Sequence, residues 1–208
     1  MNNFESAFSE MPLVAILRGL HIENAIEVSD ILIEAGFRII EVPLNSPDAL
    51  SSISLISKRH GHSAIIGAGT VLTEDEVDAV ALAGGQIVVA PNINSKVGTA
   101  AISRGLTWCP GILSPTEAFL ALDLGAKILK LFPAELVPPG AVSAMRAVLP
   151  TGTKTVAVGG ISKENMLEYF SAGANGIGLG SSLFKPSYKL NEIRQRAEEL
   201  IRVKKDME

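Results

Sequence analysis

The chain has 208 residues, a formal net charge of −4 and a composition that is 47% hydrophobic and 19% charged. These values are typical of a globular protein with one sizeable core, and they exclude a mostly disordered chain. The slightly acidic balance, without any basic run, argues against a nucleic-acid partner.

Three further features concern the location of the protein. No apolar run approaches the roughly 18 residues that a membrane span needs. The N-terminal segment lacks the basic and apolar stretches of a secretory signal. The only cysteine, Cys109, cannot form an internal disulfide. We therefore expect a cytoplasmic protein with no membrane partner.

Eight short apolar runs recur along the chain. They cover residues 13–17, 38–42, 64–68, 86–90, 106–109, 127–132, 155–159 and 176–180. Each run is followed by a polar loop and a stretch of helical spacing. Clear examples of such stretches are residues 23–36, 73–85, 114–126 and 162–174.

This alternation predicts the fold class. Strands that are almost continuously apolar are buried on both faces, which indicates a parallel sheet. Eight strand–helix units predict an α/β fold, a single (β/α)8 TIM barrel, with a doubly wound open sheet as the alternative. We expect residues 1–208 to form this one domain, with a short helix before the first strand and a helix at the C-terminal end.

Four predicted strands carry a polar side chain near their carboxyl ends, where barrel enzymes place their chemistry. These side chains are Arg18, Glu41, Thr70 and Lys130. Because strand side chains alternate between faces, Lys130 shares a face with Ile128 and Phe132. Burial among apolar groups lowers a lysine pKa, and a neutral amine can attack a ketone to form an imine. Alternatively, Lys130 extends to solvent from its strand end.

Glu41 shares a face with Ile39 and Pro43 in the second strand. Two ionisable groups of opposite sign within apolar strands are costly unless they are paired or functional. A carboxylate beside an imine can move protons to the carbinolamine hydroxyl, and to or from the enamine and the aldehyde oxygen. The pattern favours Glu41 and Lys130 as catalytic residues, with a structural buried ion pair as the alternative.

Glycines follow the last two strands, within residues 155–160 and 176–182. Their backbone N–H groups can approach an anion, and a short helix starting near Ser181 would add its positive end. We therefore expect a phosphate on the substrate, although such glycines also relieve crowding at tight turns.

Metal and thiol chemistry have little support in the sequence. Cys109 has no nearby histidine and is expected to be a packing residue. The three histidines are scattered and form no ligand cluster. We expect neither a metal nor a cofactor.

Eight short motifs stand in the same order as in a known enzyme family. They are AILRG (15–19), EVPLNSP (41–47), GAGTVL (67–72), APNIN (90–94), CPGILSPTE (109–117), KLFPAE (130–135), VGGIS (158–162) and GLGSSLF (178–184). In this order they resemble the bacterial KDPG/KHG aldolase family. The resemblance implies a (β/α)8 homotrimer that reversibly cleaves a phosphorylated 2-keto-3-deoxy sugar acid to pyruvate and glyceraldehyde 3-phosphate.

The resemblance also assigns roles to residues. It implies that Lys130 forms the Schiff base and that Glu41 is the general acid/base. The substrate-binding residues of the family correspond to Thr70, Pro91, Phe132, Gly159, Gly160, Gly180 and Ser181.

Two positions depart from the gluconate-type members of the family. Those members have an arginine for the pyruvyl carboxylate after the second strand, where this chain has Asn45. Arg18, at the end of the first strand, is expected to bind that carboxylate instead. Val158 replaces a threonine before the Gly159–Gly160 pair. Both departures resemble the members of the family that act on the galactonate, the C4 epimer. For Val158 the physical reason is that losing a hydroxyl changes which C4 configuration finds a hydrogen bond.

Three other functions remain open. The first is a gluconate-specific, dual-epimer or 4-hydroxy-2-oxoglutarate aldolase of the same family. The second is another phosphate-binding barrel enzyme, an isomerase or decarboxylase, which would not need a lysine that forms an imine. The third is an inert sugar-phosphate sensor, against which the intact pair of Glu41 and Lys130 argues.

Overall fold

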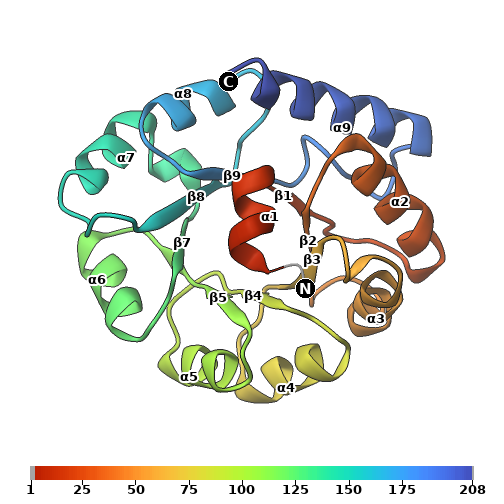
Figure 1. Cartoon of the computed structure of the whole chain (residues 1–208), viewed down its shortest axis with the longest axis horizontal. Coiled ribbons are helices and arrows are strands. Elements are labelled where there is room, and N and C mark those ends of the chain that lie inside the picture. Colours follow the sequence, from red (N-terminus) through yellow and green to blue (C-terminus); the bar gives the residue numbers. More distant parts are fainter. Residues whose placement is uncertain (1–2, 208) are drawn as a thin grey trace.

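The computed structural model describes residues 3–207, so residues 1, 2 and 208 of the expected domain lie outside the described part. Strands form a central ring that helices surround (Figure 1). All strand pairs are parallel, in the order β5-β4-β3-β2-β1-β9-β8-β7-β6. The fold is therefore the (β/α)8 barrel that the alternation of strands and helices predicts.

The strands match the apolar runs of the sequence. They are β1 (Leu13–Ile16), β2 (Ile39–Pro43), β3 (Ile65–Gly69), β4 (Ile87–Val89), β5 (Thr107–Cys109), β6 (Gly111–Ile112), β7 (Ile128–Leu131), β8 (Lys154–Val158) and β9 (Gly176–Leu179).

The fifth strand of the barrel is divided, which the sequence prediction of one run at 106–109 missed. β5 pairs with β4, and β6 pairs with β7, with Pro110 between them. Proline has no N–H to donate to a neighbouring strand, so it interrupts the ladder. Its carbonyl still accepts a hydrogen bond of 2.9 Å from the Lys130 N–H. The two short segments together close the ring.

The outer layer consists of helices that follow the strands. They are α2 (Ala25–Ala35), α3 (Ala49–His60), α4 (Glu74–Leu82), α5 (Ser95–Ser103), α6 (Pro115–Asp123), α7 (Pro139–Arg146), α8 (Met166–Ser171) and α9 (Leu190–Lys205), with short 3-10 helices η1 (Ile22–Asn24) and η2 (Ala134–Leu136). In α4, Thr73 and Glu76 form the expected capping box, and Pro115 opens α6. Within residues 3–207, no helix combines the length and apolar character needed to cross a membrane.

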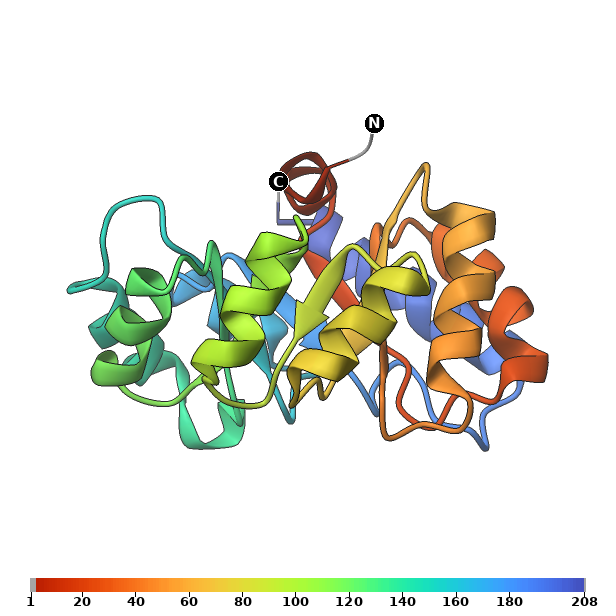
Figure 2. The ribbon, with the colours of Figure 1, turned by 90° about the horizontal axis from the view of Figure 1, so that it is seen from below.

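The helix α1 (Phe4–Glu10) fills one end of the barrel. It lies across the ring in Figure 1, and Figure 2 places it opposite the loop that follows β9. The Phe4 and Phe8 rings stack 5.3 Å apart and belong to the cluster of side chains inside the barrel. Arg38 binds Glu10 at 2.6 Å and so ties α1 to the barrel. The interior is therefore closed at the amino ends of the strands.

Candidate active site

Alternation along the strands places two ionisable side chains inside the barrel, as the sequence predicts. Ile39 and Ile128 belong to the interior cluster, whereas Ile40 and Leu129 pack outward against the helices. Glu41 shares the parity of Ile39, and Lys130 that of Ile128. Lys130 is 6% exposed and Glu41 is 2% exposed, so Lys130 does not extend to solvent.

The environment of Lys130 favours its neutral form. Its Nζ lies 4.3 Å from the centroid of the Phe132 ring. Burial lowers the pKa of Lys130, and the negative charge of Glu41 opposes that shift. The amine is therefore uncharged in more molecules than a solvated lysine, which is what a nucleophile requires.

Glu41 is poised to exchange a proton near neutral pH. Burial raises the pKa of Glu41 to about 7, although the positive charges of Lys130 and Arg18 oppose the shift. Its carboxyl group lies against Gly69, in space that any larger residue there would fill. The Oε2 atom has no hydrogen-bond partner among the described residues. A buried acid of this kind suits general acid/base chemistry.

Glu41 and Lys130 act on one another electrostatically, but they form no direct ion pair in the described part of the chain. The structural ion pair considered from the sequence is therefore absent. Neither side chain makes a hydrogen bond within residues 3–207, so both can interact with a substrate inside the barrel.

Thr70 and Pro91 border this pair without lining the cavity described below. Thr70 has a φ of 57°, in the left-handed region that non-glycine residues rarely adopt. It directly follows Gly69, the neighbour of the Glu41 carboxyl group. The backbone of Pro91 lies so close to Gly111 that a side chain at position 111 would overlap the Pro91 carbonyl. Gly111 in turn pairs with Lys130, so Thr70 and Pro91 lie beside the strands that carry Glu41 and Lys130.

A cavity of about 150 Å³ opens at the carboxyl ends of β1, β7, β8 and β9. Its lining contains most of the substrate-binding residues that the sequence proposes. The lining residues are Ile16, Arg18, Phe132, Val158, Gly159, Gly160, Ile161, Gly178, Gly180 and Ser181. Phe132 connects this cavity with Lys130, because its ring contacts the lysine amine.

Arg18 has a partner that the sequence did not assign to it. Its Nη1 donates a hydrogen bond of 2.7 Å to Asn45 Oδ1, from the loop after β2. Asn45 stands out in the sequence only as a departure from a family motif. Residues 27 positions apart become neighbours only because β1 and β2 pair in parallel.

The glycine loops after β8 and β9 both line this cavity, and one element in them differs from the sequence prediction. Gly159 and Gly160 have φ values of 112° and 63°, which favour glycine. The Glu135 side chain occupies the space that a side chain on either glycine would need. The short helix expected near Ser181 is instead a turn, in which the N–H groups of residues 183 and 184 both donate to the carbonyl of residue 180 at 2.9 Å.

Cys109 packs inside the barrel, as expected. Burial raises the pKa of its thiol to about 12, so the thiolate is scarce at neutral pH. Within residues 3–207, no three histidine, cysteine, aspartate or glutamate side chains group as metal ligands.

Comparison with known proteins gives consistent results. The family described as KDPG and KHG aldolase matches residues 4–200. A probable 2-dehydro-3-deoxy-6-phosphogalactonate aldolase of Rhizobium meliloti (strain 1021) is 46% identical over 188 residues, which cover 90% of this chain and 89% of that protein. The 2-dehydro-3-deoxy-6-phosphogalactonate aldolase of Escherichia coli (strain K12) is 43% identical over 189 residues, covering 91% and 92%.

More distant relatives and solved structures agree. A KHG/KDPG aldolase of Escherichia coli (strain K12) is 32% identical over 169 residues, which cover 80% of this chain and 78% of that protein. A solved structure described as "Native KDPGal structure" superposes with a TM-score of 0.93 at 42% identity, covering 95% of this chain and 96% of that one. Because the family model matches nearly the whole length of the chain, the chain belongs to the KDPG and KHG aldolases.

Proposed function

We propose that this protein is a class I aldolase that cleaves 2-dehydro-3-deoxy-6-phosphogalactonate to pyruvate and glyceraldehyde 3-phosphate, through an imine on Lys130. The observation that carries the proposal is a buried amine and a buried carboxyl group beneath a cavity rimmed by Arg18 and two glycine loops. The two most similar relatives described above bear the name of this activity.

The first half of the reaction joins substrate and enzyme. The neutral amine of Lys130 adds to the C2 carbonyl carbon and forms a carbinolamine. The protonated carboxyl group of Glu41 gives its proton to the carbinolamine hydroxyl, which leaves as water, and the protonated imine remains beside the Glu41 carboxylate. A pKa of about 7 lets Glu41 hold this proton at neutral pH.

The second half breaks the carbon chain. The Glu41 carboxylate takes the proton of the C4 hydroxyl, the C3–C4 bond breaks, and its electrons pass into the protonated imine to give a neutral enamine. The aldehyde leaves, and the Glu41 carboxyl group, which now holds the proton from the C4 hydroxyl, gives it to C3 of the enamine. Water hydrolyses the resulting imine, which releases pyruvate and restores the amine.

The remaining residues hold the substrate. Arg18 binds the carboxylate and thereby aims C2 at the amine. Thr70, Pro91 and Phe132 surround the three-carbon part that becomes pyruvate. Backbone N–H groups of the glycine loops bind the phosphate. The phosphate ligands are Gly159, Gly160, Gly180 and Ser181. We further infer a cytoplasmic homotrimer, on the family resemblance.

Reduction of the imine tests the covalent step. Borohydride together with pyruvate should add one reduced pyruvyl group at Lys130, detected by peptide mass analysis. Lys130 is buried, whereas Lys127 in the same segment is exposed. Lys127→Met should therefore label normally, and Lys130→Met should not label at all. A label at Lys127 would contradict the mechanism.

The Glu41→Gln variant should lower kcat by about 10²–10⁴-fold, because a general acid/base is lost. It should also change stability in a pH-dependent way. The pKa of Glu41 rises from 4.5 to about 7 on folding, so this group favours the folded state below pH 4.5, and that contribution is lost as pH rises through 7. The glutamine side chain of Glu41→Gln does not titrate, so it is neutral at every pH and does not bring a buried charge.

Urea unfolding at two pH values measures this effect. Glu41→Gln should increase the free energy of unfolding at pH 8 by roughly 3 kcal/mol, and should change it little at pH 4.5. A variant with normal kcat, or one destabilised at pH 8, would argue against the assigned role of Glu41.

Arg18→Ala should lower kcat/KM by about 10- to 150-fold, because a charged hydrogen bond to the carboxylate contributes roughly 1.5–3 kcal/mol. Arg18→Lys should recover only part of the loss, since an ammonium cannot make two parallel hydrogen bonds. Steady-state kinetics of condensation at varied pyruvate concentrations measures this. An unchanged KM for pyruvate in Arg18→Ala would contradict the proposal that Arg18 binds the pyruvyl carboxylate.

The choice of epimer depends on Val158, which lines the cavity at the end of β8. The wild-type enzyme should have a higher kcat/KM for the galactonate than for the gluconate epimer. Val158→Thr should reduce this preference by about tenfold, because the added hydroxyl offers a hydrogen bond to the other C4 configuration. Equal kcat/KM values for both epimers in the wild-type enzyme would favour a dual-epimer aldolase.

A further inference from the structure

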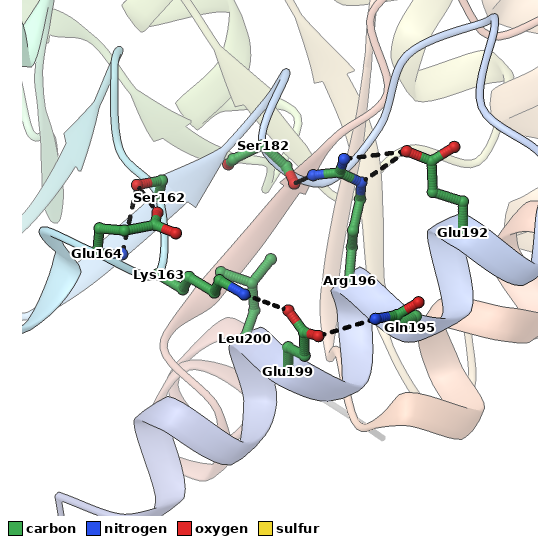
Figure 3. Close-up of a pocket in the computed structure, with 9 residues that line it drawn as sticks. All are labelled: Ser162, Lys163, Glu164, Ser182, Glu192, Gln195, Arg196, Glu199 and Leu200. Carbon is green, nitrogen blue, oxygen red and sulfur yellow. Dashed lines mark hydrogen bonds and ion pairs between the residues drawn. The ribbon is translucent and has the colours of Figure 1, made fainter.

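A polar groove of about 330 Å³ lies outside the barrel, between α9 and the loops after β8 and β9 (Figure 3). Each of the two cationic side chains that line it already has a carboxylate partner. Lys163 binds Glu199 at 2.7 Å, and Arg196 binds Glu192 at 2.9 Å. The cations of the groove are thus paired within the fold and are not free to bind an anion. Arg196 has a further contact, with the loop after β9.

Arg196 extends from α9 to the backbone of the loop after β9. Its Nη1 donates a hydrogen bond of 3.2 Å to the carbonyl of Ser182, beside the pair with Glu192 (Figure 3). Its guanidinium carbon lies 4.4 Å from the centroid of the Tyr188 ring. The Tyr188 hydroxyl donates a hydrogen bond of 3.2 Å to the carbonyl of Ser181. Two consecutive carbonyls are therefore held from outside the barrel.

The hydrogen bonds to these two carbonyls also fix the directions of the backbone N–H groups that follow them. In a trans peptide unit the carbonyl and the following N–H point in opposite directions. The Ser181 carbonyl points to Tyr188, so the Ser182 N–H points away from it. The Ser182 carbonyl points to Arg196, and the next N–H, of Leu183, donates inward to Gly180 at 2.9 Å.

The same loop borders both the active-site cavity and the loop after β8. Ser181 lines the cavity. The Ser182 hydroxyl donates a hydrogen bond of 2.8 Å to the carbonyl of Ile161, which joins the two glycine loops. A change in the direction of these peptide units would therefore alter both sides of the site at which the phosphate is proposed to bind.

We propose that Arg196 and Tyr188 are positioning residues for the substrate phosphate, which act by orienting the peptide units of residues 180–183. This inference rests on the proposed function, since it needs a phosphorylated substrate. Neither residue lines the cavity at the carboxyl ends of the strands, and Lys130 lies on a separate strand, β7. Their contribution is thus confined to the phosphate end of the substrate.

Aldol addition of pyruvate to two acceptors separates this role from a general structural one. D-glyceraldehyde 3-phosphate carries the phosphate, and D-glyceraldehyde lacks it. Tyr188→Phe removes only the hydroxyl and keeps the ring beneath Arg196. Arg196→Gln removes the charge and the contact with the loop. Arg194→Ala is the matched control. Arg194 lies on the same helix as Arg196 and forms an ion pair of 2.8 Å with Glu34 of α2, away from the loop after β9.

Tyr188→Phe and Arg196→Gln should each raise KM for the phosphorylated acceptor by about three- to tenfold, the effect of one lost hydrogen bond. They should also weaken inhibition by inorganic phosphate to a similar extent. Values of kcat/KM for D-glyceraldehyde, and the yield of borohydride trapping with pyruvate, should remain unchanged. Arg194→Ala should resemble the wild-type enzyme in every measurement.

Equal losses with both acceptors would overturn the proposal, because they indicate a general structural role. Unchanged kinetics in both variants would overturn it as well. Circular dichroism and thermal unfolding identify a variant that fails to fold, and Tyr188→Phe, which removes a single atom, then decides the question. If the wild-type enzyme itself does not prefer the phosphorylated acceptor, the proposed function fails, and that result is independent of the variants.

Discussion

The chemistry proposed for this protein depends on two ionisable side chains that an apolar barrel keeps out of water. Charge is disfavoured in such surroundings, so burial pushes the pKa values of Glu41 and Lys130 toward each other. The carboxyl group then holds a proton near pH 7, and the amine loses one more readily than in solvent. The same burial that costs stability thus supplies an acid and a nucleophile at one place.

Much of this arrangement could be predicted from the sequence, because it follows from strand periodicity. Ile39 and Ile128 mark the interior parity of their strands, and the two ionisable residues share it. The number and order of the strand–helix units predict the barrel. The division of the fifth strand at Pro110 was missed, because a proline within an apolar run can stand at a strand end or between two segments.

Other features could not be predicted, because they depend on contacts between distant loops. Asn45 meets Arg18 only through the pairing of neighbouring strands, and Glu135 meets Gly159 only through the path of the loop after β7. The residues after Gly180 form a single hydrogen-bonded turn that is not continued into a helix. A single sequence carries no periodic signal for such contacts.

The helix α1 has a kinetic consequence. Its phenylalanines fill the barrel at the amino ends of the strands, so substrate and both products share one mouth at the opposite end. In the proposed mechanism, the three-carbon fragment stays covalently attached to the buried Lys130 while the aldehyde is released. The aldehyde must therefore leave first and, in the reverse direction, enter last. The proposed covalent step and the single mouth together give an ordered release and an ordered binding.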